Sequence, residues 1–148
     1  MRALPLTSAI VAAGAATVAI WFAVDEWSRR ETLALGARLY AERCAACHGR
    51  TLEGQANWKV RLPSGRLPAP PHDADGHTWH HSDAELFRIT KGGMAAVVSD
   101  YESDMPAFAG VLADAEIEAV IAFIKSTWPE RERAYQAARS RARQGAGS

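Results

Sequence analysis

The longest apolar run of the chain lies at its N-terminus. Residues 3–24 carry no charged side chain and consist mainly of Ala, Val, Ile, Leu, Trp and Phe. A helix of this length is about 33 Å long at roughly 1.5 Å per residue, enough to cross a bilayer core. The small residues at 12–16 leave a cleaved signal peptide as the alternative. The apolar residues 18–24 that follow them favour an uncleaved transmembrane anchor over residues 1–24.

Helical periodicity resumes after a polar segment, residues 25–30, which we interpret as a short linker. Residues 31–44 carry apolar positions at helical spacing, namely Leu35, Leu39 and Tyr40. Gly36 marks a place on this helix where another backbone can approach closely. Residues 49–74 contain several Gly and Pro and no periodicity, which predicts a loop.

Two more helices are predicted in the second half of the chain. The first covers residues 82–91, because Ser82 is a typical N-cap and Glu85 completes a capping box. The second covers residues 114–128, where apolar residues recur at helical spacing until Pro129 prevents continuation. No segment alternates between apolar and polar residues as a strand would, so the predicted fold is all-α.

These elements form one small domain, which we place at residues 31–129. Residues 130–148 hold five Arg against two Glu and end in Gly-Ala-Gly-Ser, which predicts a frayed helix and a flexible basic tail. The whole chain has 17 basic and 17 acidic side chains. This balance gives no indication of a nucleic-acid partner.

The most specific chemical motif is Cys44-Ala45-Ala46-Cys47-His48. Two cysteines three positions apart, followed directly by a histidine, have the spacing for covalent attachment of c-type haem. Each thiol forms a thioether with one vinyl group, and one helical turn places both sulfur atoms on the same side of the chain. His48 then becomes the proximal ligand of the iron. The sequence has no other cysteine, so none is left for a disulfide.

Two alternatives compete with haem for the cysteine pair. A thioredoxin-like redox motif would need a βαβ pattern around it, which the sequence lacks. A zinc site could take its second half from His77 and His81, which have an H-x3-H spacing. The gap from Cys47 to His77 is longer than a usual finger loop, and His48 would have no role, so haem is favoured.

An electron-carrying haem needs a sixth ligand that keeps the iron low-spin. Met105 is the first candidate, because Pro106 restricts it towards an extended backbone and a thioether raises the reduction potential. Met94 is the second, and a core-filling role is the alternative for Met105. A histidine is the third, from the cluster His72, His77, His80 and His81. This cluster could also bind copper or zinc, but its place before a helix start favours no metal role.

These motifs, in this order, resemble a known family. A helix leads into residues 44–49, a proline-rich loop follows, and then come Met105-Pro106-Ala107-Phe108 and a last helix ending at Trp128. Residues 32–129 thereby resemble a class I monohaem cytochrome c of the membrane-anchored bacterial type. The resemblance implies that the first and last helices cross around a covalent haem, with Gly36 close to Phe123 or a neighbour of it.

The resemblance also implies a ligand set, in which Cys44 and Cys47 hold the porphyrin while His48 and Met105 bind the iron. A proline carbonyl after the motif would accept a hydrogen bond from the proximal ring and orient it. Pro70 is the first choice, and the alternatives are Pro68 and Pro71. Three aromatic residues are candidates for pocket walls: Trp58, Trp79 and Phe108.

The function implied is that of a single-electron carrier, not an enzyme, between a membrane-bound donor and a membrane-bound acceptor of a respiratory chain. The alternatives are a fixed haem subunit of a larger membrane oxidoreductase, or a haem sensor or peroxidase with a labile sixth ligand. The expected location is the inner membrane, single-pass, with the cytochrome domain in the periplasm, where haem is attached. An acidic cluster could steer a basic partner: Asp100, Glu102 and Asp104.

Overall fold

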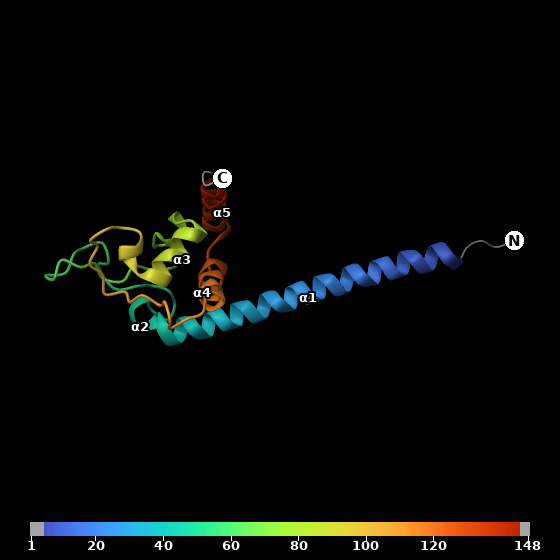
Figure 1. The fold of residues 1–148 in the computed structure, drawn as a ribbon, viewed down its shortest axis with the longest axis horizontal. Helices are drawn as coiled ribbons and strands as arrows, with labels where there is room; N and C mark the ends of the chain where they lie inside the picture. Colours follow the sequence, from blue (N-terminus) through green and yellow to red (C-terminus); the bar gives the residue numbers. More distant parts are fainter. Residues whose placement is uncertain (1–4, 146–148) are drawn as a thin grey trace. The chain divides into compact units, whose positions relative to one another are not determined.

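The structure is a computed structural model that describes residues 5–145, without the side chains of residues 5–13 and 15. Regular structure in this range is helical, and the only β-type pairing there is an isolated bridge between Ala109 and Leu112 (Figure 1). This confirms the predicted all-α fold. The chain divides into two compact units, residues 1–32 and 33–148.

The first helix, α1, runs from Pro5 to Arg43 without a break. It includes residues 25–30, so the linker predicted there is helical. Glu26 pairs with Arg29 at 2.6 Å and with Arg30 at 2.7 Å. Ion pairs at these three- and four-residue spacings support a helix without any apolar face to bury. The change to polar residues therefore does not end the helix.

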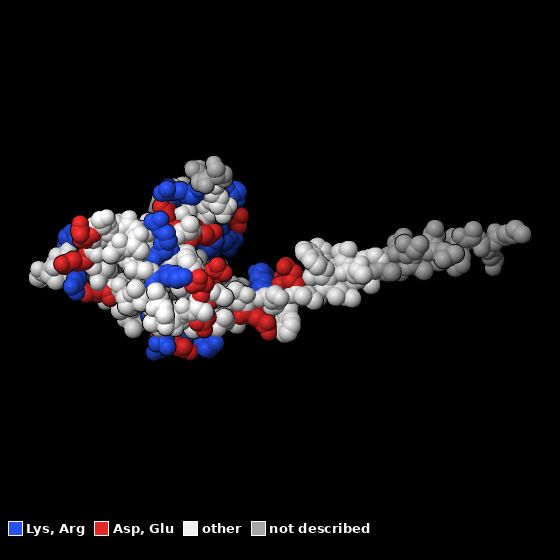
Figure 2. Space-filling model, viewed as in Figure 1, with Lys and Arg blue, Asp and Glu red and all other residues white. Residues whose placement is uncertain are grey.

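The large apolar side chains described in the first unit are exposed, namely Val18, Ile20, Trp21, Phe22, Val24 and Trp27. Figure 2 shows that charged side chains follow the uncharged part of this unit, beginning in the sequence at Asp25. Across the part of the chain that the structure describes, no helix is long and apolar enough to cross a membrane. The transmembrane anchor predicted over residues 1–24 is therefore not supported there, and the side chains of residues 1–13 and 15 lie outside the described part.

The second unit is organised by the crossing of α1 with α4 (Asp114–Ser126). Gly36 makes this crossing possible, because a Cβ there would overlap the backbone oxygen of Ala119 and would come within 2.9 Å of Phe123 Cβ. The close approach predicted at Gly36 is thus confirmed. The core beside the crossing is formed mainly by Leu39, Tyr40, Ile117, Val120, Ile124 and Trp128.

A third helix, α3 (Asp83–Gly92), packs against α4 and has the predicted capping box. Glu85 N–H donates to Ser82 Oγ at 3.3 Å, and Ser82 N–H donates to Glu85 Oε2 at 2.9 Å. The start of α4 has only half of this arrangement. Ala113 offers no side-chain acceptor, but its N–H donates to Glu116 Oε2 at 2.9 Å.

Short elements interrupt the loops on either side of α3: the single turn α2 (Ala45–His48) and the 3-10 turns η1 (Thr78–His80) and η2 (Met94–Ala96). The long loop predicted after the cysteine motif is confirmed, since no helix longer than η1 lies between α2 and α3. These loops carry most of the residues that surround the candidate site.

The C-terminal segment forms the predicted helix, α5 (Glu130–Gly145), but this helix packs on the domain and is not frayed, and residues 146–148 lie outside the described part. One face of α5 is buried although it is polar, at Glu132, Gln136 and Ser140. Gln136 Nε2 donates to His81 O at 3.2 Å and to Asp83 Oδ1 at 2.9 Å, and Ser140 Oγ accepts from Asp83 N–H at 3.0 Å. The helix is held by hydrogen bonds, so its low hydropathy did not reveal that it packs on the domain.

Candidate functional site

The cysteine motif forms a tight turn directly after α1. Cys44 ends one helix and precedes the next, and the N–H groups of Cys47 and His48 both donate to Cys44 O, at 3.1 and 2.9 Å. The buried Tyr40 hydroxyl donates to Gly49 O at 3.0 Å and is 3.3 Å from His48 O. The turn therefore has a fixed conformation, tied to the core of the domain through Tyr40.

Both cysteines are free thiols, with Cys44 half-buried and Cys47 exposed. Burial, followed by the neighbouring Cys47, raises the pKa of the Cys44 thiol to about 11. Reactive cysteines of redox enzymes have lowered pKa values, so the environment of Cys44 does not favour a thioredoxin-like role. Among the described residues, no group of three or more His, Cys, Asp or Glu side chains could hold a metal ion. The zinc alternative therefore has no support in them.

The imidazole of His48 is buried and directed by a backbone carbonyl. His48 Nδ1 lies 2.8 Å from Pro70 O, which can only accept, so Nδ1 carries the proton. Burial lowers the pKa of His48, and the bond to Pro70 opposes that shift. A neutral ring protonated at Nδ1 has its lone pair on Nε2, which is the atom left for a metal. The hydrogen bond predicted between His48 and Pro70 is thus present.

The proline segment reaches His48 because Gly54 lets it pass. Gly54 has a φ of +67°, and a Cβ there would overlap the backbone of Pro71. Gly54 N–H donates to His48 O at 2.8 Å, and Gln55 N–H donates to Ala69 O at 2.9 Å. Two neighbouring residues thereby connect the cysteine turn to the proline segment. These hydrogen bonds place the carbonyl of Pro70 beside the ring of His48. No periodic pattern in the sequence predicts them.

The histidines that follow lie in three different surroundings. The His72 ring stacks on the His48 ring, with centroids 4.0 Å apart and planes at 22°. His77 stacks on Trp58, and the exposed His80 stacks on Trp79. If His48 held the iron of a haem, a ring stacked on His48 would lie on the same side of the porphyrin and would not supply the opposite ligand. The four histidines thus form no common ligand set.

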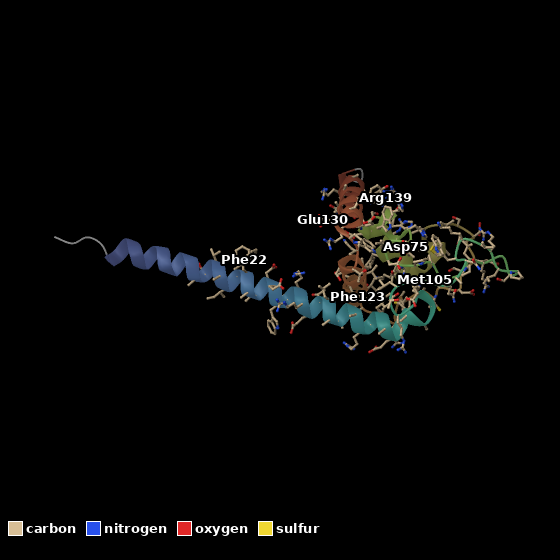
Figure 3. All side chains as sticks on the ribbon, turned by 180° about the vertical axis from the view of Figure 1, so that it is seen from behind. Phe22, Asp75, Met105, Phe123, Glu130 and Arg139 are labelled. Atoms are coloured by element: carbon tan, nitrogen blue, oxygen red, sulfur yellow. The ribbon has the colours of Figure 1, made fainter. Side chains whose placement is uncertain are left out.

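Met105 lies on the loop that leads to α4 (Figure 3). It is partly buried and packs against the hydrophobic core, with its N–H 3.1 Å from Ser103 Oγ. Met94, in η2, is not among the residues packed on that core cluster. The loop is tied back by Arg66, whose Nη1 lies 2.5 Å from Asp104 Oδ1 and whose Nε lies 3.8 Å from Glu102 Oε2. Packing on the core is also what the core-filling alternative predicts for Met105, so its role as a ligand stays a prediction.

Two of the three predicted wall residues pack on the core, because Phe108 is buried in it and Trp79 lies partly buried against it. Sequence reasoning missed two contacts in this region. It treated His72 as one of four clustered histidines, although His72 alone touches His48. It also missed the indole of Trp128, whose Nε1 donates to His72 O at 2.7 Å. No local pattern connects residues this far apart.

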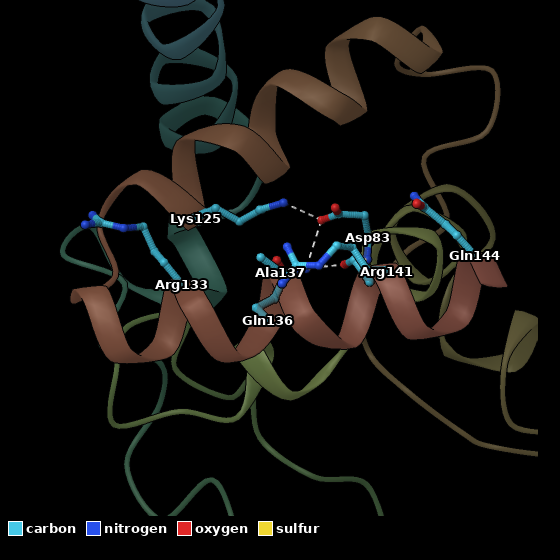
Figure 4. Close-up of a pocket in the computed structure, with 8 residues that line it drawn as sticks. Asp83, Lys125, Arg133, Gln136, Ala137, Arg141 and Gln144 are labelled. Atoms are coloured by element: carbon cyan, nitrogen blue, oxygen red, sulfur yellow. Dashed lines mark hydrogen bonds and ion pairs between the residues drawn. The ribbon is translucent and has the colours of Figure 1, made fainter. Parts of the chain in front are cut away.

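A surface pocket lies elsewhere, between α4 and α5 (Figure 4). Figure 4 shows Lys125 and Gln136 both directed at Asp83, with Lys125 Nζ 2.5 Å from Asp83 Oδ1. Basic residues form much of the remaining wall, at Arg133 and Arg141. None of the cysteine motif residues lines this pocket, and the hydrogen bonds of Asp83 with Gln136 and Ser140 in it hold α5 in place.

The family model described as cytochrome c oxidase, cbb3-type, subunit III matches residues 31–124. No curated protein and no solved structure matches the chain. The matched range covers well over half of the chain and includes the second part of α1, the cysteine turn, the proline segment, the Met105 loop and most of α4.

Proposed function

The chain belongs to the family of cbb3-type cytochrome c oxidase subunit III, and from this premise we propose that it is a single-electron carrier. It holds one covalent haem c through Cys44 and Cys47, with His48 and Met105 as axial ligands. The family supports haem-based electron transfer by a class I monohaem c-type cytochrome. The contact that carries the ligand assignment is the 2.8 Å hydrogen bond from His48 Nδ1 to Pro70 O.

The side chains fit this group by their chemistry. Two free thiols lie on one turn, and the histidine beside them is neutral with Nε2 free to coordinate. The thioether of Met105 comes from a separate loop and would be the second ligand of the iron. When bound, haem takes up and releases one electron with little change in geometry.

Each of these residues has a separate task. Pro70 fixes the tautomer and orientation of His48, so the ligand needs no rearrangement when the iron changes its charge. Phe108 is buried in the core cluster against which Met105 packs, so the loop that carries Met105 is supported by apolar side chains. As a ligand, the thioether of Met105 would favour ferrous iron over ferric iron and would give a higher potential than a second histidine.

An absorption spectrum of the ferric holo-protein tests the ligand set. The weak near-infrared charge-transfer band of methionine-ligated ferric haem should be present in the wild type and in Met94→Ala, and lost in Met105→Ala. Loss of the band in Met94→Ala alone would reverse the assignment. A wild-type protein without the band would point to a histidine from residues 72–81 as the sixth ligand, or to an open sixth position, as in a haem sensor or peroxidase.

A second candidate function is that of a fixed haem subunit, which the description of the matched family favours by naming an oxidase subunit. A carrier exchanges between its donor and acceptor, whereas a subunit copurifies with its enzyme at constant stoichiometry. Purification from native membranes in a mild detergent, with haem quantified against protein, separates the two.

The partners we propose are a membrane-bound donor and a membrane-bound acceptor. We place the domain on the periplasmic side of the inner membrane, where bacterial haem attachment takes place and where cytochrome c domains of this family are typical. Attachment to the bilayer through residues 1–24 stays a prediction from the sequence. Fractionation of cells that express the full chain tests it, because an alkaline carbonate wash releases a protein that lacks an anchor.

A further inference from the structure

A second imidazole lies face to face with the proximal ligand. The rings of His48 and His72 have centroids 4.0 Å apart and are inclined by only 22°. At this separation the two rings are in van der Waals contact. His48 therefore cannot rotate its ring plane freely, because one face of it meets the ring of His72.

His72 is itself held at several points. The backbone N–H of His72 donates to Leu52 O at 2.8 Å, and the backbone carbonyl of His72 accepts from Trp128 Nε1 at 2.7 Å. The edge of the Tyr40 ring approaches it, with the two centroids 6.1 Å apart. Trp128 and Tyr40 are among the most deeply buried residues of the domain, so the backbone of His72 is fixed by the core.

The ring of His72 is also fixed in its plane by a side-chain contact. His72 Nδ1 lies 2.8 Å from Thr78 Oγ1, and Thr78 Oγ1 lies 3.3 Å from Pro71 O. The Thr78 hydroxyl has one hydrogen, which it donates to Pro71 O, so it accepts the Nδ1–H of His72. The carbonyls of Pro70 and Pro71 thereby orient two imidazoles, one directly and one through Thr78.

The two restraints on His48 are complementary. The hydrogen bond to Pro70 fixes the position of one edge of the ring, whereas the contact with His72 fixes the plane of the ring. The plane of an axial imidazole determines which iron d orbital its π electrons overlap. Residues that orient a metal ligand tune the metal without touching it. Packing alone would not need a polar ring at this site, since an apolar ring would fill the space at a lower desolvation cost.

We propose that His72 is a positioning residue, which sets the plane of the His48 ring through their stacking contact and thereby tunes the reduction potential of the haem. This inference rests on the proposed function, because it takes His48 as the proximal ligand. Its chain of contacts is Pro71, Thr78, His72 and His48.

The test uses ferric holo-protein and two readouts, the pattern of haem methyl NMR shifts and the midpoint potential. Both depend on the ligand plane, and the methyl pattern is not altered by a mere loss of stability. His72→Leu removes the stacked ring. Thr78→Val keeps the ring of His72 but removes the hydroxyl that accepts its Nδ1–H. Thr78→Ser keeps the hydroxyl. His80→Leu is the matched control, because His80 stacks on Trp79 and not on His48.

We expect both readouts to shift in His72→Leu and in Thr78→Val, and to stay at wild-type values in Thr78→Ser and His80→Leu. Wild-type values in His72→Leu would overturn the proposal. If His72→Leu holds no haem, wild-type values in Thr78→Val would overturn it. The methionine band of each variant separates this outcome from a failure of the proposed function, since that failure would remove the band from the wild type as well.

Discussion

The two ring nitrogens of His48 have different tasks, and the residues around them were predictable to different degrees. Nδ1 donates to Pro70 O at 2.8 Å, and a proline carbonyl was expected there because the motif and the proline loop occur in a familiar order. The stacking of His72 on the same ring was not expected. His72 is 24 positions away, and only the path of the loop through Gly54 brings it near.

Gly36 allows a test at the scale of single residues. Both the sequence and the structure place it where another helix approaches closely. A Cβ in Gly36→Ala would overlap the backbone oxygen of Ala119, which cannot rotate away. Overpacking of this kind costs about 1–3 kcal/mol, so the free energy of unfolding in urea should fall by that amount. Gly14→Ala is the control, because nothing lies within 4 Å of its Cβ position. Equal stability of the two variants would show that α1 and α4 do not cross at Gly36.

At the scale of elements, α5 shows how a helix with little apolar surface is held. Gln136 is completely buried and donates to His81 O and Asp83 Oδ1. Ser140, one turn later, accepts from the backbone of Asp83. These bonds satisfy polar groups of Asp83 and His81 at the start of α3, and Arg143 adds an ion pair with Glu85 at 2.8 Å. The helix therefore completes the N-terminus of α3, which a hydropathy pattern cannot show.

Gln136→Ala should weaken the attachment of α5 to the start of α3. It leaves the carboxylate of Asp83 with one donor fewer and His81 O without its amide donor, at a cost of about 1–3 kcal/mol. Hydrogen exchange should then speed up in α5 before it does in α4. Arg141→Ala, an exposed change on the same helix, should leave both measurements unchanged. Unchanged exchange in Gln136→Ala would mean that other contacts hold α5.

The hydrogen bonds that Asp83 accepts predict that the stability of the fold depends on pH. Burial raises the pKa of Asp83, but hydrogen bonds from Lys125 and Gln136 outweigh it, so the pKa lies below its ordinary value of 3.8. A carboxyl with a lowered folded-state pKa stabilises the fold fully above its unfolded pKa, and this contribution disappears as the pH falls through the folded value. Asp83→Asn should therefore destabilise the protein at pH 7, and its difference from wild type should shrink below about pH 3.8. Exposed Glu118→Gln should show no such convergence, and a constant difference for Asp83→Asn would contradict the assignment.

At the scale of the whole molecule, charges of both signs are interspersed over the face of the second unit seen in Figure 2. The acidic cluster expected to steer a basic partner is partly neutralised, because Arg66 pairs with Asp104 and Glu102. Only Asp100 of the three has no place in this network of ion pairs. The loop beside Met105 therefore offers a weaker acidic field than the sequence indicates.

Arg66→Gln should make the electrostatic potential beside Met105 more negative. Oxidation of the ferrous holo-protein by the anion ferricyanide should slow roughly twofold to tenfold at low ionic strength, because the negative charges of Asp104 and Glu102 are no longer balanced. The effect should disappear at about 1 M salt, where the screening length is about 3 Å. Arg88→Gln removes the same charge from an exposed position on α3 and should have a smaller effect. Equal slowing in both variants would show that only net charge matters.

The sequence by itself determined the parts of this protein that depend on local chemistry. The spacing of Cys44, Cys47 and His48 predicts the turn to which we propose that haem is attached, Ser82 with Glu85 starts α3, and Gly36 permits a close helix crossing. These features involve residues within one or two helical turns, or a single residue whose small size is itself the signal.

Only the tertiary structure decided how the loops and the C-terminus meet the site. It placed His72 on the face of His48, joined Arg66 to Asp104, and held α5 against Asp83 through buried polar side chains. Such contacts join residues far apart in the chain through hydrogen bonds and ring contacts. They have no periodicity, and they are made by polar residues whose composition predicts exposure, so only the folded chain brings them together.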